Sequence, residues 1–172
     1  VDTIQNAEQI ISSIEVELNL LNSMHIEYKD VNNWNQYLAD YLAQYGAIHQ
    51  GTQPSFAELL QNKLNQNPGW VLQPYPVAIP HLKDDLIQHP LIVITILDQA
   101  ITMQNAHNDL FKIKYLIGLF IPNNDEMAQL VGELSAELGH HLGHIDDFMK
   151  QPEQLKHNLR NSFLKRIKKQ LI

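Results

Sequence analysis

Two apolar segments in the middle of the chain most strongly limit what it can fold into. Leu91–Leu97 has the sequence LIVITIL, and Lys112–Ile121 has the sequence KIKYLIGLFI. The first is a short continuous apolar run rich in β-branched residues, which is typical of a strand buried on both faces. The second is predicted to be another buried strand. A strand of this kind needs other secondary structure packed against it to exclude water. The two segments therefore predict the centre of a layered sheet.

Helical periodicity occurs on both sides of these strands. Apolar residues recur every three to four positions in three segments before them and in two segments after them. The predicted helices cover about residues 4–21, 34–45, 56–64, 125–138 and 152–172. Short strands are expected at Met24–Tyr28 and Ile101–Met103. Helices before and after a group of buried strands predict an α/β fold: a central mixed β-sheet with helices on both faces, an α/β sandwich.

The first helix has a single apolar stripe. Its members are Ile4, Ala7, Ile11, Ile14, Leu18 and Leu21. Such a stripe indicates a helix that packs on the domain or connects it to a preceding one. We therefore divide the chain into residues 1–23, an N-terminal helix or interdomain connector, and residues 24–172, one domain. Because the chain starts at Val1 rather than at methionine, we expect it to be a fragment of a longer protein or a trimmed form of one.

Charge and composition exclude several classes of function. The formal net charge is -7, which disfavours contact with duplex DNA and favours a basic protein partner. The absence of cysteine rules out disulfides, thiolate metal sites and cysteine nucleophiles. The sequence has no apolar run of the roughly 20 residues that a membrane span requires, and no signal peptide. We therefore expect a cytoplasmic protein without direct nucleic-acid contact or membrane insertion.

A histidine cluster near the C-terminus raises the question of a metal site. His140, His141 and His144 lie within the sequence HHLGH, and a helix would place the first and last on one face. The cluster lacks an HExxH pattern, and glycines flank it, so polar histidines at a helix end are the preferred interpretation. The sequence also lacks Gly-rich phosphate loops and a GxSxG motif. No metal or other cofactor is expected.

The segment VAIPHLKDD, residues 77–85, places a histidine in a different context. His81 follows a short apolar, strand-like segment, and functional groups in open α/β sheets tend to lie at strand ends. Pro80 restricts the backbone just before it. A neutral imidazole can act as a nucleophile, and Lys83 can offset the charge of a phosphate. Asp84 and Asp85 either guide a basic partner or belong to a solvated loop, and His81 itself is either functional or structural.

A family resemblance favours the functional interpretation of His81. The segment PYPVAIPH, which ends at His81, and the later segment HPLIVITIL, which ends at Leu97, together resemble the enzyme IIA domain of the bacterial phosphoenolpyruvate-dependent sugar phosphotransferase system, mannitol/fructose type. The order of the other predicted elements also fits, so the resemblance covers roughly residues 24–172. In this family the motif histidine accepts a phosphoryl group from the phosphocarrier HPr and passes it to an enzyme IIB domain. The resemblance implies that role for His81.

The sequence departs from the family pattern at two places. Family members usually have an Arg-Glu pair before the AIPH turn, whereas this chain has QNKLNQNPGW there, with Lys63 as its only charged residue. Many also have a second histidine near the start of the helix after the long strand, where this chain has Met127. Methionine cannot donate a hydrogen bond to a phosphate. The nucleophile is therefore present without its usual electrostatic helpers.

Three functions are compatible with these observations. The first is a regulatory IIA-like domain at the end of a multidomain transcription activator or antiterminator, whose phosphorylation at His81 by HPr or a IIB partner reports sugar flux. The second is a free-standing enzyme IIA that passes phosphate to IIB during sugar transport. The third is an interaction module that is never phosphorylated. In the first two, neutral His81 attacks a partner's phosphohistidine in line, and positioning supplies most of the catalysis.

Overall fold

The two apolar segments form adjacent strands of one sheet in a computed structural model, which describes residues 2–171. The strands are β1 (Met24–Lys29), β2 (Val77–Ala78), β3 (His81–Lys83), β4 (Leu91–Gln104) and β5 (Leu110–Ile121). Their order is β1-β4-β5-β2, and β3 also pairs with β5. Strand β4 is antiparallel to β5, whereas β2 and β3 are parallel to it. A mixed sheet with helices confirms the predicted α/β class.

Strand β4 corrects one prediction, because the segments 91–97 and 101–103 belong to a single strand. Its residues pair with β5 on both sides of a register shift between Ile96 and Ile101. The intervening segment 98–100 is exposed and contains two polar residues, Asp98 and Gln99, which is why the apolar pattern stops there although the strand continues. The irregularity has the character of a β-bulge, which bends a strand without ending it.

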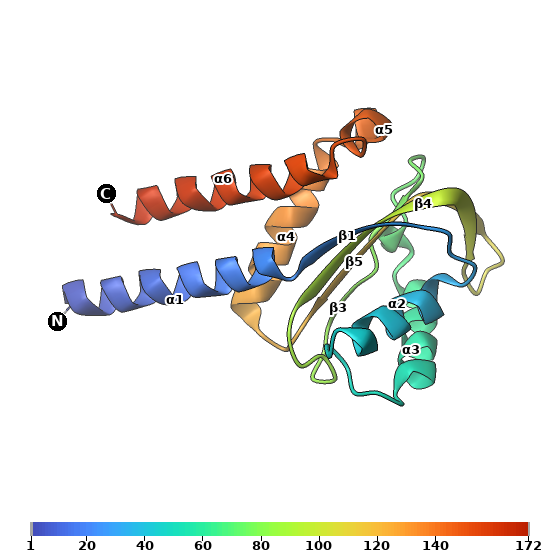
Figure 1. The fold of residues 1–172 in the computed structure, drawn as a ribbon, viewed down its shortest axis with the longest axis horizontal. Helices are drawn as coiled ribbons and strands as arrows, with labels where there is room; N and C mark the ends of the chain where they lie inside the picture. The colour runs from blue at the N-terminus through green and yellow to red at the C-terminus, as the bar shows by residue number, and fades with distance from the viewer. Residues whose placement is uncertain (1, 172) are drawn as a thin grey trace. The chain divides into compact units, whose positions relative to one another are not determined.

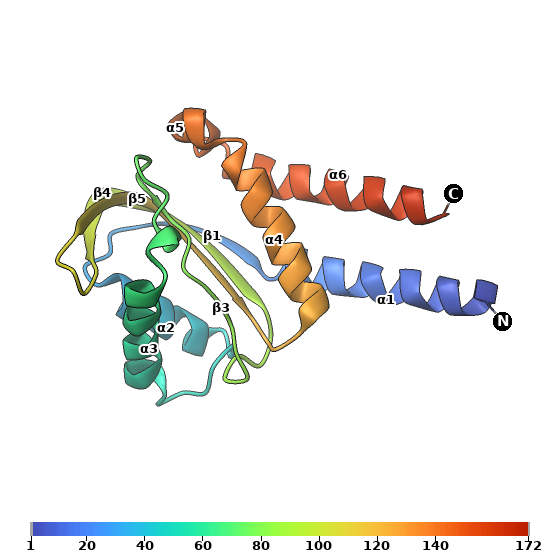
Figure 2. The same ribbon diagram turned by 180° about the vertical axis from the view of Figure 1, so that it is seen from behind.

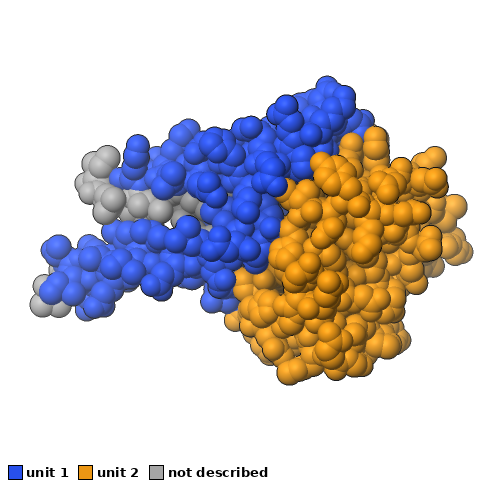
Figure 3. All heavy atoms as spheres, viewed as in Figure 1, with its two compact units in different colours: residues 1–24, 124–172 blue, residues 25–123 orange. Residues whose placement is uncertain are grey.

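Two helices cover one face of the sheet within the unit formed by residues 25–123, coloured orange in Figure 3. They are α2 (Trp34–Gln44) and α3 (Gln53–Gln66), followed by the 3-10 turn η1 (Pro68–Trp70). Figures 1 and 2 show both helices against the sheet. Their apolar residues share one core with alternate residues of β4 and β5, and Gly46 ends α2 with a positive φ of 74°, as its position after the apolar stripe predicts.

Gly118 of β5 lies close against two side chains of this core. A Cβ atom at this position would lie 2.5 Å from the ring of Phe120 and 3.3 Å from Leu38 of α2. Real side chains do not approach that closely, so only glycine fits there without displacing its neighbours. The glycine within KIKYLIGLFI therefore allows α2 to lie close to the sheet.

The second compact unit consists of residues 1–24 and 124–172 and is helical. Its helices are α1 (Asp2–Asn22), α4 (Asp125–Gly139), the 3-10 turn η2 (Leu142–His144), α5 (Ile145–Phe148) and α6 (Pro152–Leu171). These elements confirm the helices predicted at both ends of the chain. Helix α1 contacts α4 and α6, and α4 also contacts α6. Within residues 2–171, none of the helices has the length and apolarity needed to cross a bilayer.

Candidate functional site

His81 follows directly on a break in the edge of the sheet. Strand β2 ends at Ala78, yet the pairing with β5 resumes at once, because the N–H of Leu119 donates to the carbonyl of Pro80 at 2.9 Å. His81 itself lies opposite Leu119 in the ladder. The sequence predicts a loop after His81, but the structure has the strand β3. Pro80 lacks an N–H and still offers a carbonyl, which is sufficient for a parallel ladder to restart.

The alternation of β3 decides which way its side chains point. His81 and Lys83 are exposed, whereas Leu82 between them is buried in the core. Because side chains alternate along a strand, His81 and Lys83 lie on one face, about 6–7 Å apart along the chain. The structure therefore brings together the predicted acceptor and the predicted phosphate-contacting lysine.

The imidazole of His81 is oriented by its own backbone. Its Nδ1 atom lies 2.8 Å from the carbonyl oxygen of Ile79. A carbonyl can only accept a hydrogen bond, so Nδ1 carries the proton in this arrangement. In the neutral ring the lone pair then belongs to Nε2, which is the atom available to an incoming electrophile.

The ring of Trp70 packs beside the ring of this histidine. Its ring centroid lies 5.7 Å from that of His81, with a tilt of 49° between the planes. Trp70 is 2% exposed, and its carbonyl accepts the N–H of Ile79 at 2.7 Å. One residue therefore packs against the ring of His81 and also anchors the peptide that orients it. Nothing in the local sequence indicates that Trp70 lies beside His81.

The loop after β3 is organised by Asp84. One carboxylate oxygen of Asp84 accepts the N–H of Leu86 at 2.9 Å, and its carbonyl accepts the N–H of Ile87 at 3.1 Å. Ile87 is buried and anchors the loop in the core. Asp85, by contrast, is exposed, and Leu86 is 54% exposed. Asp84 is thus a turn-forming residue, and Asp85 and Leu86 present one charge and one apolar side chain next to the strand that holds His81.

The structure also places the two positions at which the sequence departs from the family pattern. Lys63 lies in the last turn of α3, in the segment that continues to Trp70. Met127 lies in the first turn of α4, where its N–H donates to the capping side chain of Asn124 at 3.0 Å. Met127 is 8% exposed, so its position combines a helix cap with apolar packing.

The C-terminal histidines form a small cluster. His141 Nδ1 lies 3.0 Å from His144 Nε2, and the ring of His141 stacks on Phe148 with centroids 3.9 Å apart. Glu137 lies 3.4 Å from the other ring nitrogen of His141. Among the residues that the structure describes, no group of three possible ligands is arranged to hold a metal ion.

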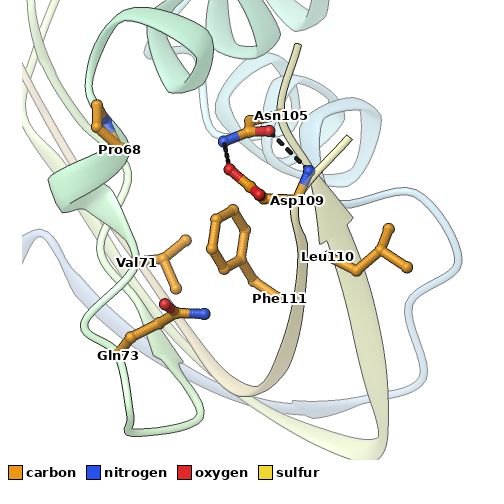
Figure 4. Close-up of a pocket in the computed structure, with 7 residues that line it drawn as sticks. All are labelled: Pro68, Val71, Gln73, Asn105, Asp109, Leu110 and Phe111. Atoms are coloured by element: carbon orange, nitrogen blue, oxygen red, sulfur yellow. Dashed lines mark hydrogen bonds between the residues drawn. The ribbon is translucent and has the colours of Figure 1, made fainter. Parts of the chain in front are cut away.

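A separate hollow lies at the tip of the β4–β5 hairpin. It has a volume of about 360 Å³ and is lined by Pro68, Val71, Gln73, Asn105, Asp109, Leu110 and Phe111. Figure 4 shows the amide of Asn105 bonded to Asp109 at its rim. The amide nitrogen of Asn105 donates that bond, whereas its amide oxygen accepts two backbone N–H groups of the turn. These polar groups are therefore used to form the turn, and His81 is not among the residues that line the hollow.

Known proteins resemble this chain in sequence pattern and in fold. A family model described as phosphoenolpyruvate-dependent sugar phosphotransferase system, EIIA 2, matches residues 19–143. A putative PTS IIA domain from Streptococcus pyogenes M1 GAS is similar in structure with a TM-score of 0.54 and 15% identity, over 85% of this chain and 93% of that one. Nitrogen regulatory protein IIA-Ntr from Neisseria meningitidis gives a TM-score of 0.49 and 13% identity, over 69% and 80% of the two chains. No curated protein sequence matches.

Proposed function

Because the chain belongs to the EIIA type 2 family of the phosphoenolpyruvate-dependent sugar phosphotransferase system, we propose that His81 accepts a phosphoryl group from HPr or from an enzyme IIB partner. The observation that supports this role most directly is the hydrogen bond from Nδ1 of His81 to Ile79. It leaves the Nε2 lone pair on an exposed edge strand, within reach of another protein. The division into residues 1–23 and an EIIA domain at residues 24–172 is part of the same proposal.

The proposed step is an exchange of one N–P bond for another. The Nε2 lone pair of His81 attacks the phosphorus of the partner's phosphohistidine, and the partner's N–P bond breaks in line with the bond that forms. The electron pair of the broken bond returns to the partner's ring nitrogen. The proton on Nδ1 of His81 stays in place, and its bond to the Ile79 carbonyl strengthens as positive charge develops on the ring.

The surroundings of His81 supply positioning more than charge. Trp70 and the Ile79 carbonyl restrict the ring of His81, so little rotational freedom remains to be lost when the ring adopts its reactive orientation. Lys83 lies on the same face of β3 and lowers the repulsion that a phosphoryl group meets. Asp85 and Leu86 in the following loop offer a basic, partly apolar partner a place to dock.

The two departures from the family pattern favour a regulatory role. Met127 provides no donor, and the segment from Lys63 to Trp70 contains no Arg-Glu pair. A phosphohistidine with fewer donors gains less electrostatic stabilisation, so transfer is expected to be slower than in an efficient carrier. A regulatory domain can function with slow transfer of the phosphoryl group, because it reports phosphorylation rather than passing the group on. We therefore assign the domain to a sugar-responsive transcriptional regulator, an activator or antiterminator.

Phosphorylation would be read out through the loop that follows His81. A phosphoryl group adds a charge of about -2 near Asp84 and Asp85. Asp84 organises this loop through its carboxylate, and like charges at short range repel. Reordering of the loop would change the surface seen by the other parts of the regulator.

The test is intact-mass analysis after incubation with phosphoenolpyruvate, enzyme I and HPr. The parent chain and His107→Ala are expected to gain one acid-labile phosphate, and His81→Ala is expected to gain none. His107 is a suitable control because it is exposed in the hairpin turn. Absence of the gain in the parent chain would contradict the proposal and leave an interaction module. Rapid onward transfer to IIB would instead identify a free-standing enzyme IIA.

A further inference from the structure

Helix α1 has an apolar stripe with a seven-residue repeat, and part of this stripe is exposed. Ile4, Ile11 and Leu18 are 65%, 56% and 51% exposed. Three residues after these come Ala7, Ile14 and Leu21, which completes an a/d heptad pattern over three repeats. Ala7 is exposed, Ile14 is half-buried and Leu21 is buried, so the free part of the pattern is mainly its a positions. This is the pattern of a helix that packs along another helix. The stripe is unusual because large aliphatic residues in a row on one helix are ordinarily buried.

Acidic residues flank this stripe. Glu8 and Glu15 are exposed and follow Ile4 and Ile11 by four residues, so they lie beside the stripe at the positions that set partner choice in coiled coils. The described side chains of α1 include no lysine or arginine. Two copies of α1 packed on each other would bring these carboxylates together. The preferred partner of the stripe is therefore a helix with basic flanks.

Helix α6 has the complementary character. Leu164 is 51% exposed, and Arg160 and Lys168, four residues before and after it, are exposed on the same side of the helix. Lys165 adds a further positive charge next to Leu164. Leu164 of α6 thus lies between two cations, whereas the apolar stripe of α1 is flanked by two carboxylates. The two helix surfaces are therefore complementary in charge.

The two helices belong to one helix pair in each chain. Figures 1 and 2 show α1 and α6 side by side and running in opposite directions. Every copy therefore has both an acidic and a basic member. A second copy related by a two-fold axis supplies a basic helix for α1 and an acidic helix for α6 in the same contact.

We propose that two copies of this chain associate through these helices, α1 of each copy against α6 of the other, in an antiparallel four-helix bundle. Helix α1 spans about 30 Å, and two helices side by side cover roughly 600 Å² per copy. A total of about 1,200 Å² is at the lower end of stable interfaces, so a dimer that dissociates in the micromolar range is expected. This association is independent of the proposed role of His81.

Sedimentation equilibrium of the chain over about 1 to 300 µM, a range chosen for an interface of this size, tests the proposal. The mass is expected to rise from 19.8 kDa toward twice that value. Ile11→Glu is expected to weaken association at least tenfold, whereas Gln9→Glu, which adds the same charge at an exposed site on α1, is expected to leave it within twofold. A parent chain that stays monomeric throughout, or a dimer unaffected by Ile11→Glu, would overturn the proposal.

Charge reversal tests which helices meet. One variant combines Glu8→Lys with Glu15→Lys, and the other combines Arg160→Glu with Lys168→Glu. Each alone is expected to be monomeric, and an equimolar mixture is expected to recover the parent's dimer, because each reversed helix then faces its complement. Failure of the mixture to associate, with both variants showing the parent's far-UV circular dichroism, rejects the α1–α6 pairing. All four positions are exposed, so these substitutions leave the core unchanged.

Discussion

Nδ1 of His81 lies 2.8 Å from the carbonyl oxygen of Ile79, two residues earlier in the chain. The carbonyl holds the ring proton on Nδ1, and the phosphoryl group is therefore expected on Nε2. Phosphorus-31 NMR of the phosphorylated chain distinguishes the two isomers of phosphohistidine. A resonance from the Nδ1 isomer would mean that the ring turns away from Ile79 before it reacts.

Trp70 connects the stability of the domain to the orientation of His81. Replacing this buried side chain by alanine is expected to lower the free energy of unfolding by about 3–5 kcal/mol, since it removes a large apolar surface and leaves a cavity. Trp70→Phe is expected to cost less. Urea denaturation measures both, with Tyr28→Ala as control because Tyr28 is 62% exposed.

The same variants separate packing from positioning. If Trp70 also restricts the ring of His81, Trp70→Phe should slow phosphorylation by HPr under conditions in which the variant is fully folded. An unchanged rate in folded Trp70→Phe would limit the role of Trp70 to packing.

Gly118 is expected to tolerate no side chain. Gly118→Ala would place a methyl group 2.5 Å from Phe120, and overpacking of this kind costs about 1–3 kcal/mol. Gly132→Ala is the matched control: a Cβ there meets nothing within 4 Å, and alanine is favoured over glycine in a helix by up to about 1 kcal/mol. Thermal or urea unfolding should therefore show opposite changes. Equal stability of the two variants would contradict the packing described at Gly118.

Tyr41 links α2 to β1 and predicts a limit to alkaline stability. Its hydroxyl donates to Glu27 at 2.8 Å and lies 3.0 Å from His25 Nδ1. Burial, followed by the bond to Glu27, raises the pKa of Tyr41 above its ordinary value. The folded state therefore keeps the phenol neutral where the unfolded state ionises. Since the unfolded state then binds fewer protons, the free energy of unfolding should fall as the pH rises above about 10.

Tyr41→Phe provides the test of that relation. At neutral pH the variant is expected to lose about 1 kcal/mol, the usual contribution of such a hydrogen bond. Above pH about 10 its stability should fall less steeply than that of the parent chain, so that the two curves approach each other. Tyr28→Phe, at an exposed position, should follow the parent chain. Parallel curves for Tyr41→Phe and the parent chain would show that ionisation of Tyr41 does not affect folding.

The success of the sequence-based predictions depended on how local the determining interactions are. The two apolar runs and the helical stripes predicted the strands and helices well, because periodic burial shows directly in residue order. The prediction failed at β3 and in the middle of β4. His81–Lys83 became a strand through pairing with β5, and the exposed segment 98–100 remained within β4 because the flanking residues stayed paired with Leu110–Tyr115. In both cases, pairing with residues distant in the sequence determined that the segment is part of a strand.

The sequence by itself determined the α/β class, the family resemblance and His81 as the candidate acceptor. These follow from residue types and short spacings, which physical chemistry connects to burial and nucleophilicity without reference to the rest of the chain. Only the tertiary structure decided that Trp70 packs beside His81 and that Ile4, Ile11 and Leu18 of α1 are exposed. Each of these depends on which distant segments pack together, because a side chain acquires its neighbours, and with them its chemistry, only when the chain has folded.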